Sequence, residues 1–312
     1  MNYKVAISVG DTNGIGPEIL LRSHAEISHY CHPIYCIHPE LLQKIASKLK
    51  LPYDKNISCI EPNAAIPEIN KGKIQLDSGY YSYQSFDLAC KLAEEKKVDF
   101  ICTLPIHKQA WSEAKIPFIG HTQSLSKRYK ASGIMMLGCE KMFVALFSDH
   151  IPISQVTQIL TKENFLQFLF NFQKAIKEKN IAVLGINPHC GDGGVIGTED
   201  EIIKEAIKEA NAQLGDEIFK GPFSADSAFS PKMREQYHYF IAPYHDVGLA
   251  PLKALYFDES INITLNIPIL RTSVDHGVAF DIAYQNKASL TSYKNAILSG
   301  IKIKEKHAKK IS

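Results

Sequence analysis

The sequence predicts an α/β protein with a three-layer α/β/α arrangement, in which a mixed, mainly parallel sheet is covered by helices on both faces. Two observations predict it. Short β-branched runs alternate with longer helical patterns along the chain, which is typical of a parallel sheet covered on both sides. The chain also has 312 residues, more than a single core usually accommodates, and this length favours two lobes.

The elements follow from local patterns. The first strand is expected at Lys4–Val9, and a helix follows after Gly16, with Pro17 at its favoured first position. Further strands are expected at Ile34–Ile37, Phe100–Thr103, Met142–Phe147, Ile181–Ile186, Tyr239–Ala242 and Ile261–Leu265. Further helices are expected at Tyr83–Lys97, Glu163–Glu178 and Thr198–Ala212. A new strand pattern starts at Gly133, so the crossing between lobes is expected near Lys130. The first lobe then comprises residues 1–130 and 275–312, and the second comprises residues 131–274.

Bulk properties exclude several classes of function. The net charge is only +2, and the single basic cluster, Lys302 to Lys310, has no aromatic residues interleaved, so we expect no nucleic-acid partner. No apolar run has the length of a membrane span or a signal-peptide core, so no membrane association is expected. The seven cysteines are scattered and form no C-x-x-C pair, so neither a disulfide framework nor a thiolate zinc site is indicated, and a reducing cytoplasm is the simplest location.

Three histidines occupy the same position relative to three expected strands. His150, His189 and His245 each stand three residues beyond the end of an apolar run. In open α/β sheets ligands bind at that edge, and three neutral imidazoles with an open coordination position make a catalytic divalent-metal site. Imidazoles suit zinc, while cobalt, manganese and magnesium remain alternatives.

The neighbours of these histidines fit the same interpretation. Asp149, Asp192 and Asp246 stand beside them in the sequence and are candidates to fix their tautomers. Other metal-binding combinations, which would use His121 or His276, stay open.

Two further features suit an anionic ligand. The loop from Gly10 to Glu18 joins the first strand to a helix N-terminus, where an anion is favoured, although the same residues also form a tight turn without any ligand. Later side chains suit a phosphate or carboxylate group: Lys253, Asn262 and Arg271, with Gly120-His121-Thr122 earlier in the chain.

Together these segments resemble the 4-hydroxythreonine-4-phosphate dehydrogenase family of pyridoxal-phosphate biosynthesis. The resemblance spans nearly the whole chain, through GDTNGIGPE, GHTQ, SDHIP, NPHCGDGG, GPFSADSAF, YHDVGLAPLK and NITLNIPILRTSVDHG. The N-terminal loop and the DHGVAFDIA stretch are also similar to the isocitrate and isopropylmalate dehydrogenases. That similarity implies an isopropylmalate dehydrogenase-like fold, with the active site in the cleft between two lobes and the cofactor held by loops.

The resemblance also implies roles for individual residues. The metal ligands would be His150, His189 and His245, carried by the second lobe. The substrate contacts would be His121, Thr122, Lys253, Asn262 and Arg271. The cofactor, NAD or NADP, would contact Gly14, Asp275, His276 and Asp281 in the first lobe. The family further implies a homodimer whose site lies at the subunit interface, with His245 reaching across. The departures from the family pattern are Gln123 in place of glutamate, Val247 in place of glutamine, and Tyr284–Lys287 in place of a glycine-rich turn.

The expected reaction is NAD-dependent oxidation of 4-phosphohydroxy-L-threonine, followed by metal-assisted decarboxylation to 3-amino-2-oxopropyl phosphate. Lys253, or Asp226 acting directly or through water, is the candidate for proton transfer. Three alternatives stay open. They are the same chemistry on another phosphorylated hydroxy acid, such as a four-carbon sugar-acid phosphate, a metal-dependent hydrolase that needs no nicotinamide, and a non-catalytic phosphate-binding protein.

Overall fold

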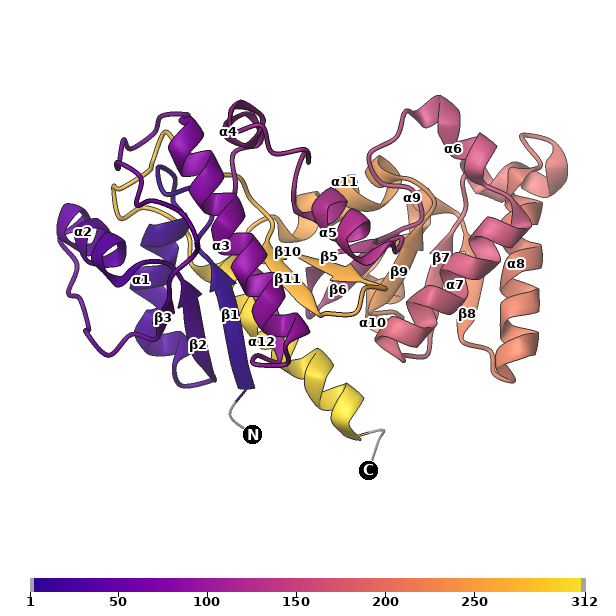
Figure 1. The fold of residues 1–312 in the computed structure, drawn as a ribbon. Helices are drawn as coiled ribbons and strands as arrows, with labels where there is room; N and C mark the ends of the chain where they lie inside the picture. The colour runs from indigo at the N-terminus through magenta and orange to yellow at the C-terminus, as the bar shows by residue number, and fades with distance from the viewer. Residues whose placement is uncertain (1–2, 310–312) are drawn as a thin grey trace. The chain divides into compact units, whose positions relative to one another are not determined.

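Strands and helices alternate as the sequence predicts in the computed structural model, which describes residues 3–309 (Figure 1). The described chain divides into two units. Unit 1 contains residues 3–131 and 261–309, and unit 2 contains residues 132–260. Within each unit the strands are mostly parallel and carry helices on both faces, so the predicted α/β class with a mixed, mainly parallel sheet is confirmed.

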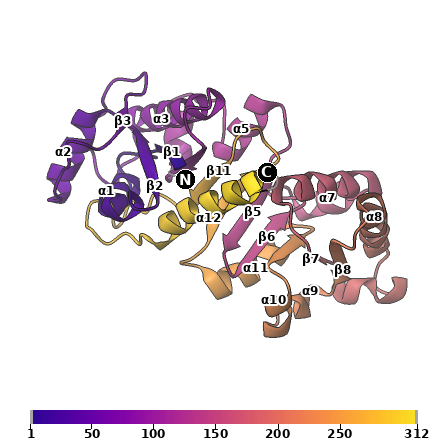
Figure 2. The ribbon, with the colours of Figure 1, turned by 90° about the horizontal axis from the view of Figure 1, so that it is seen from below.

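Unit 1 has the strand order β3-β2-β1-β4-β11-β10, in which only β10 and β11 pair antiparallel. Helix α3 covers one face of these strands, and α1 and α12 cover the other (Figure 2). Its elements are β1 (Tyr3–Ser8), α1 (Gly16–Ile27), β2 (Cys31–Cys36), α2 (Pro39–Leu49), β3 (Cys59–Ile60), α3 (Leu76–Glu94), β4 (Phe100–Thr103), α4 (Lys108–Glu113), α5 (His121–Tyr129), β10 (Ile261–Leu265), β11 (Arg271–Val274) and α12 (Thr291–Lys309).

Unit 2 has the strand order β5-β6-β9-β7-β8, in which only β5 and β6 pair antiparallel. Helix α7 lies on one face, with α8 beside it, and α11 lies on the other face. Its elements are β5 (Ile134–Cys139), β6 (Met142–Leu146), α6 (Ile153–Ile159), α7 (Lys162–Ile176), β7 (Ile181–Leu184), the short 3-10 element η1 (Pro188–Gly194), α8 (Glu199–Leu214), β8 (Phe219–Phe223), α9 (Ala225–Ala228), α10 (Pro231–Gln236), β9 (Tyr239–Ala242) and α11 (His245–Tyr256).

The division into units differs from expectation at one boundary. The first crossing follows Ala131, close to the expected position at Lys130, but the chain returns to unit 1 after Ser260 rather than after residue 274. The reason is strand pairing. β11 lies parallel to β4 and antiparallel to β10, so residues 261–274, which we expected in the second lobe, belong with the strands of unit 1.

Two sequence expectations concern the helices, namely the basic cluster near the C-terminus and the absence of a membrane-spanning segment. Helix α12 extends through most of the basic cluster to Lys309, and Lys310 lies outside the described residues. Between residues 3 and 309, no helix combines the length and the apolar character needed to span a membrane.

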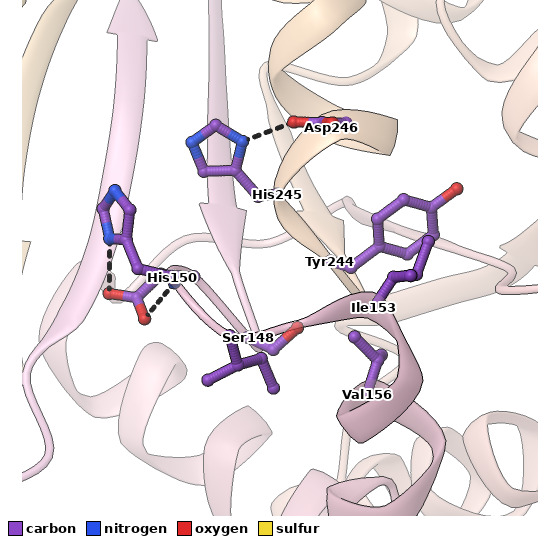
Figure 3. Close-up of a pocket in the computed structure, with 9 residues that line it drawn as sticks. Ser148, His150, Ile153, Val156, Tyr244, His245 and Asp246 are labelled. Atoms are coloured by element: carbon purple, nitrogen blue, oxygen red, sulfur yellow. Dashed lines mark hydrogen bonds and ion pairs between the residues drawn. The ribbon is translucent and has the colours of Figure 1, made fainter.

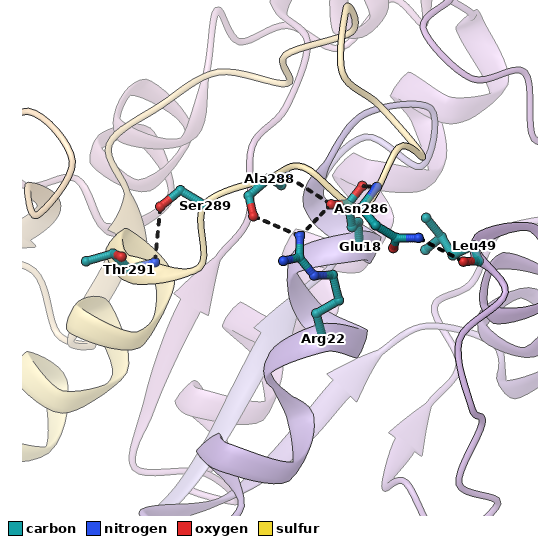
Figure 4. Close-up of polar contacts among 7 residues, drawn as sticks. All are labelled: Glu18, Arg22, Leu49, Asn286, Ala288, Ser289 and Thr291. Atoms are coloured by element: carbon teal, nitrogen blue, oxygen red, sulfur yellow. Dashed lines mark hydrogen bonds and ion pairs between the residues drawn. The ribbon is translucent and has the colours of Figure 1, made fainter.

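A buried carboxylate ties α1 to the turn before α12. The Glu18 side chain is buried, and its oxygens accept hydrogen bonds from the backbone N–H groups of Asn286 and Ala288, at 3.1 and 2.9 Å (Figure 4). Arg22 donates to Glu18 Oε1 at 2.8 Å and to the carbonyl oxygen of Ala288 at 2.9 Å. Glu18 therefore holds the turn that replaces the glycine-rich segment of the family pattern.

We expect Glu18→Ala to lower the free energy of unfolding by about 3 kcal/mol, because two backbone N–H groups and a guanidinium lose their acceptor. Glu26→Ala is the matched control, since Glu26 lies on the same helix and pairs with Lys294 at an exposed position. That change should cost less than about 1 kcal/mol. Urea unfolding curves measure both losses, and equal losses would contradict the role given to Glu18.

Candidate functional site

Three neighbouring strands of unit 2 end at one edge of its sheet. β6, β9 and β7 are adjacent and parallel, so their carboxyl ends lie together. His150 follows β6, His245 begins α11 directly after β9, and His189 lies in η1 after β7. The structure thus places the three histidines at the edge where the sequence pattern put them.

Two of these histidines lie side by side. The ring centroids of His150 and His245 are 5.5 Å apart, in a pocket of about 270 Å³ (Figure 3). Each ring has a carboxylate at Nδ1: Asp246 Oδ1 lies 2.7 Å from that atom of His245, and Asp149 Oδ2 lies 3.6 Å from that atom of His150. The hydrogen bond from His150 holds the pKa of Asp149 below its usual range, so this carboxylate is ionised at neutral pH.

Each of these two imidazoles has the surroundings of a metal ligand. Histidines that bind metals usually give their second ring nitrogen to a carboxylate, which fixes the tautomer and the ring orientation. In His245 this leaves Nε2 as the nitrogen for a metal. His189 does not line the same pocket, and across residues 3–309 no three His, Cys, Asp or Glu side chains are grouped to hold a metal ion.

The third histidine lies in an unusual turn. His189 starts a run of five consecutive residues with left-handed backbone angles, from φ 53° at His189 to φ 65° at Gly193. Its charged neighbour is Asp226 on α9, whose pKa is lowered by a hydrogen bond from the Ser224 hydroxyl and by the nearby His189. No hydrogen bond or ion pair between described residues joins the side chain of Asp192 to His189, unlike the pairing we expected.

Unit 1 contains a second group of candidate residues around a buried arginine. Arg271, at the start of β11, is 3% exposed. It donates to Thr103 Oγ1 at 2.8 and 3.1 Å, to Asn262 Oδ1 at 3.1 Å and to Thr264 Oγ1 at 3.2 Å. All of these acceptors are neutral. Burial lowers the pKa of Arg271 to about 10, which still leaves the group cationic at neutral pH.

His121 completes this group as a neutral donor. Arg271 NH2 lies 3.3 Å from His121 Nδ1, which must accept and therefore leaves the ring proton on Nε2. Nε2 is buried and has no hydrogen-bond partner among the described residues. Burial, and then the charge of Arg271, hold the pKa of His121 well below its usual value, while Phe86 and Trp111 pack around the ring.

The same residue starts a helix. His121 and Thr122 are the first two residues of α5, whose N-cap Gly120 provides no capping side chain. The backbone N–H groups of the first turn have no partner within the helix and favour an anion. Within residues 3–309 Arg271 is a buried cation without an ion-pair partner, and with the buried N–H donor and the helix N-terminus it has the chemistry to hold a phosphate or carboxylate group.

Other candidates are placed separately. Lys253 lies on α11 in unit 2, with Nζ 5.3 Å from the centre of the Phe257 ring. In unit 1, Gly14 packs against the loop that carries Asp275, His276 and Asp281, because a Cβ on Gly14 would lie 2.8 Å from the carbonyl oxygen of Val278. The four cofactor candidates therefore belong to two loops in contact.

The residues that depart from the family pattern have structural partners. Gln123 Oε1 accepts from the backbone N–H of Ile119, Val247 packs against the core of unit 2, and the Tyr284 hydroxyl donates to the carbonyl oxygen of Thr12. Thr103 and Thr264, which hold Arg271, were not predicted from the sequence. Their one signal was a polar residue within a strand that is mostly apolar.

Comparisons with known proteins found relatives that match nearly the whole chain. The family model for pyridoxal phosphate biosynthetic protein PdxA matches residues 29–299. The chain is 53% identical over 299 residues to 4-hydroxythreonine-4-phosphate dehydrogenase of Helicobacter pylori (strain J99 / ATCC 700824), covering 94% of this chain and 97% of the relative. The corresponding protein of Helicobacter acinonychis (strain Sheeba) is 54% identical, covering 94% and 96%. The crystal structure of 4-hydroxythreonine-4-phosphate dehydrogenase from Klebsiella pneumoniae is similar with a TM-score of 0.82 at 29% identity, covering 97% of this chain and 100% of that one.

Proposed function

The chain belongs to the family of pyridoxal phosphate biosynthetic proteins PdxA, and we propose on that basis that it oxidises 4-phosphohydroxy-L-threonine with NAD and releases carbon dioxide, giving 3-amino-2-oxopropyl phosphate. It is an oxidoreductase that acts on a CH–OH group in pyridoxal phosphate biosynthesis. The hydride passes from the carbon of that group to nicotinamide and the hydroxyl proton passes to a base, so the product is a 3-oxo acid that loses carbon dioxide readily.

The observation that carries the proposal is the buried guanidinium of Arg271, whose hydrogen-bond partners among residues 3–309 are all neutral. A phosphate group would provide the missing counter-charge and accept the Nε2–H of His121. Thr122 and Asn262 lie beside these two groups, at the start of α5 and on β10. The substrate's phosphate is therefore assigned to this part of unit 1.

The proposed metal ligands are His150 and His189 of one subunit and His245 of the partner subunit, so the active enzyme would be a homodimer with its site at the subunit interface. A divalent ion, zinc in the first instance, would act there as a Lewis acid that lowers the pKa of the substrate hydroxyl and stabilises the negative charge that develops as carbon dioxide leaves. The orientation of the His245 ring by Asp246 supports this assignment.

The remaining roles fall to residues of both units. We assign NAD, in preference to NADP, to the two loops that carry Gly14, Asp275, His276 and Asp281. Lys253, or Asp226 acting directly or through water, would take the proton, and the Ser224 hydroxyl, which donates to Asp226, keeps that carboxylate ionised. We place the enzyme in the cytoplasm, where reduced cysteines such as these seven persist.

The purified protein tests the proposal in one assay. With 4-phosphohydroxy-L-threonine and NAD, reduced nicotinamide should accumulate, chelation should stop it, and zinc, cobalt, manganese or magnesium should restore it to degrees that identify the preferred ion. Four-carbon sugar-acid phosphates belong in the same panel. Faster turnover of one of them would overturn the substrate assignment, and activity that survives full metal removal would overturn the metal assignment.

A further inference from the structure

One buried carboxylate on α8 holds the chain just before the turn that carries His189. Asp200 is 3% exposed, and its two oxygens accept from the backbone N–H groups of Ile186, at 2.8 Å, and Asn187, at 3.1 Å. These are the last two residues before Pro188 begins η1. Asp200 therefore fixes the main chain at the point where it leaves β7 and turns toward His189.

The hydrogen bonds of Asp200 stabilise the start of this turn. Its hydrogen bonds among the described residues all come from these backbone amides, and it is the second residue of α8, where the helix dipole favours a carboxylate. The preceding residue, Glu199, accepts from Asn187 Nδ2 at 2.8 Å. The start of α8 thus holds both the main chain and the side chain of Asn187.

Asp200 and the residues of the turn pack closely against one another. A Cβ on Gly185 would lie 2.6 Å from Asp200 Oδ1 and 2.7 Å from Cys190 Sγ, so the carboxylate and Cys190 both lie directly against this glycine. A Cβ on Gly191 would lie 2.2 Å from the carbonyl oxygen of Gly197. The backbone at Gly185 and Gly191 therefore packs closely against Asp200, Cys190 and Gly197.

The backbone of the turn needs such support. His189, Cys190 and Asp192 have φ of 53°, 54° and 47°. Residues other than glycine rarely adopt this left-handed region. Conformations of this kind persist only where the surrounding structure determines them.

We propose that Asp200 is a positioning residue for His189, and that its carboxylate keeps the left-handed turn in the one arrangement that brings this imidazole to the metal. The inference rests on the proposed function, in which His189 is a metal ligand. It adds a residue that touches neither metal nor substrate.

Asp200→Asn tests it, because the amide keeps the size of the side chain but presents a donor to one of the two backbone N–H groups. We expect the affinity for added Co²⁺, measured from the absorption spectrum of the bound ion, to fall by about 10- to 100-fold. We expect a similar fall in kcat. KM for the phosphorylated substrate should stay within about twofold, because the phosphate site lies elsewhere. In metal-free protein the imidazole NMR signals of His189 should shift. Glu201→Gln is a matched change at an exposed position on the same helix. It should leave the Co²⁺ affinity, kcat, KM and the NMR signals of His189 unchanged.

Unchanged His189 signals or unchanged Co²⁺ affinity in folded Asp200→Asn would overturn the proposal, even if the protein lost stability. If that variant fails to fold, Asp200→Glu takes its place. It retains the carboxylate but lengthens the side chain, so the same signal shift and affinity loss are required of it. A wild-type protein that does not turn over the substrate would contradict the proposed function, whereas the Co²⁺ and NMR comparisons would still decide the role of Asp200.

Discussion

Arg271→Met should lower kcat/KM for the phosphorylated substrate by about a thousandfold, mainly through KM. The guanidinium is buried and its acceptors in the described part of the chain are neutral, so the proposed phosphate would be its counter-charge. Removing one partner of a buried, hydrogen-bonded charge pair costs about 2–5 kcal/mol, and each 1.4 kcal/mol is tenfold in rate or affinity. Steady-state kinetics across a range of substrate concentrations separate KM from kcat.

Binding of inorganic phosphate gives a second measurement that does not depend on turnover. Phosphate should raise the melting temperature of the wild type, because a ligand that binds the folded state stabilises it, and should leave that of Arg271→Met unchanged. Arg271→Lys should recover only part of the affinity, since it keeps the charge but loses the planar fork.

The matched control for these measurements is Arg234→Met. Arg234 lies in unit 2, and its hydrogen-bond acceptors in the described chain are also neutral, namely the Tyr256 hydroxyl and the carbonyl oxygen of Phe229. An equal loss of kcat/KM in the two variants would remove the special role of Arg271.

The sequence predicted the fold class well because that signal is distributed over many residues. β4, β9 and β10 coincide with the expected strands, since each is an apolar, β-branched run with clear ends. β8 was missed because it contains Gly221 and Pro222, which are depleted in strands. β11 was missed because its first residues are Arg271, Thr272 and Ser273, and their burial depends on pairing with β4.

The candidate site could be predicted only as far as local pattern determines position. A histidine that follows a parallel strand must lie at the carboxyl edge, so spacing alone placed His150 and His245 together. Spacing could not predict that the turn after β7 is left-handed, because that depends on Asp200 and on packing against Gly197. Nor could it distinguish a buried arginine from a solvated one, since the threonines that bond Arg271 come from strands far apart in the sequence.

His245→Ala should lower kcat by about a thousandfold or more and reduce bound metal, while the free energy of unfolding changes by no more than about 0.5 kcal/mol, because the side chain is partly exposed and outside the core. The matched control is His238→Ala. His238 precedes β9 and is exposed at the opposite edge of the same sheet, whereas His245 follows β9. Activity, metal content and urea unfolding are compared for both variants, and an active, metal-replete His245→Ala protein would rule out His245 as a ligand.

Mixing inactive subunits then tests whether the site is shared. If His245 of the partner subunit completes a site made by His150 and His189, a hybrid of His245→Ala and His189→Ala subunits has one intact site. A statistical mixture should therefore recover about one quarter of wild-type activity. A mixture of His150→Ala and His189→Ala subunits should recover none, because each site then lacks one ligand from its own chain. If the first mixture also stayed inactive while hybrid dimers formed, all three ligands would have to come from one chain, and the turn that carries His189 would have to move toward the His150–His245 pair.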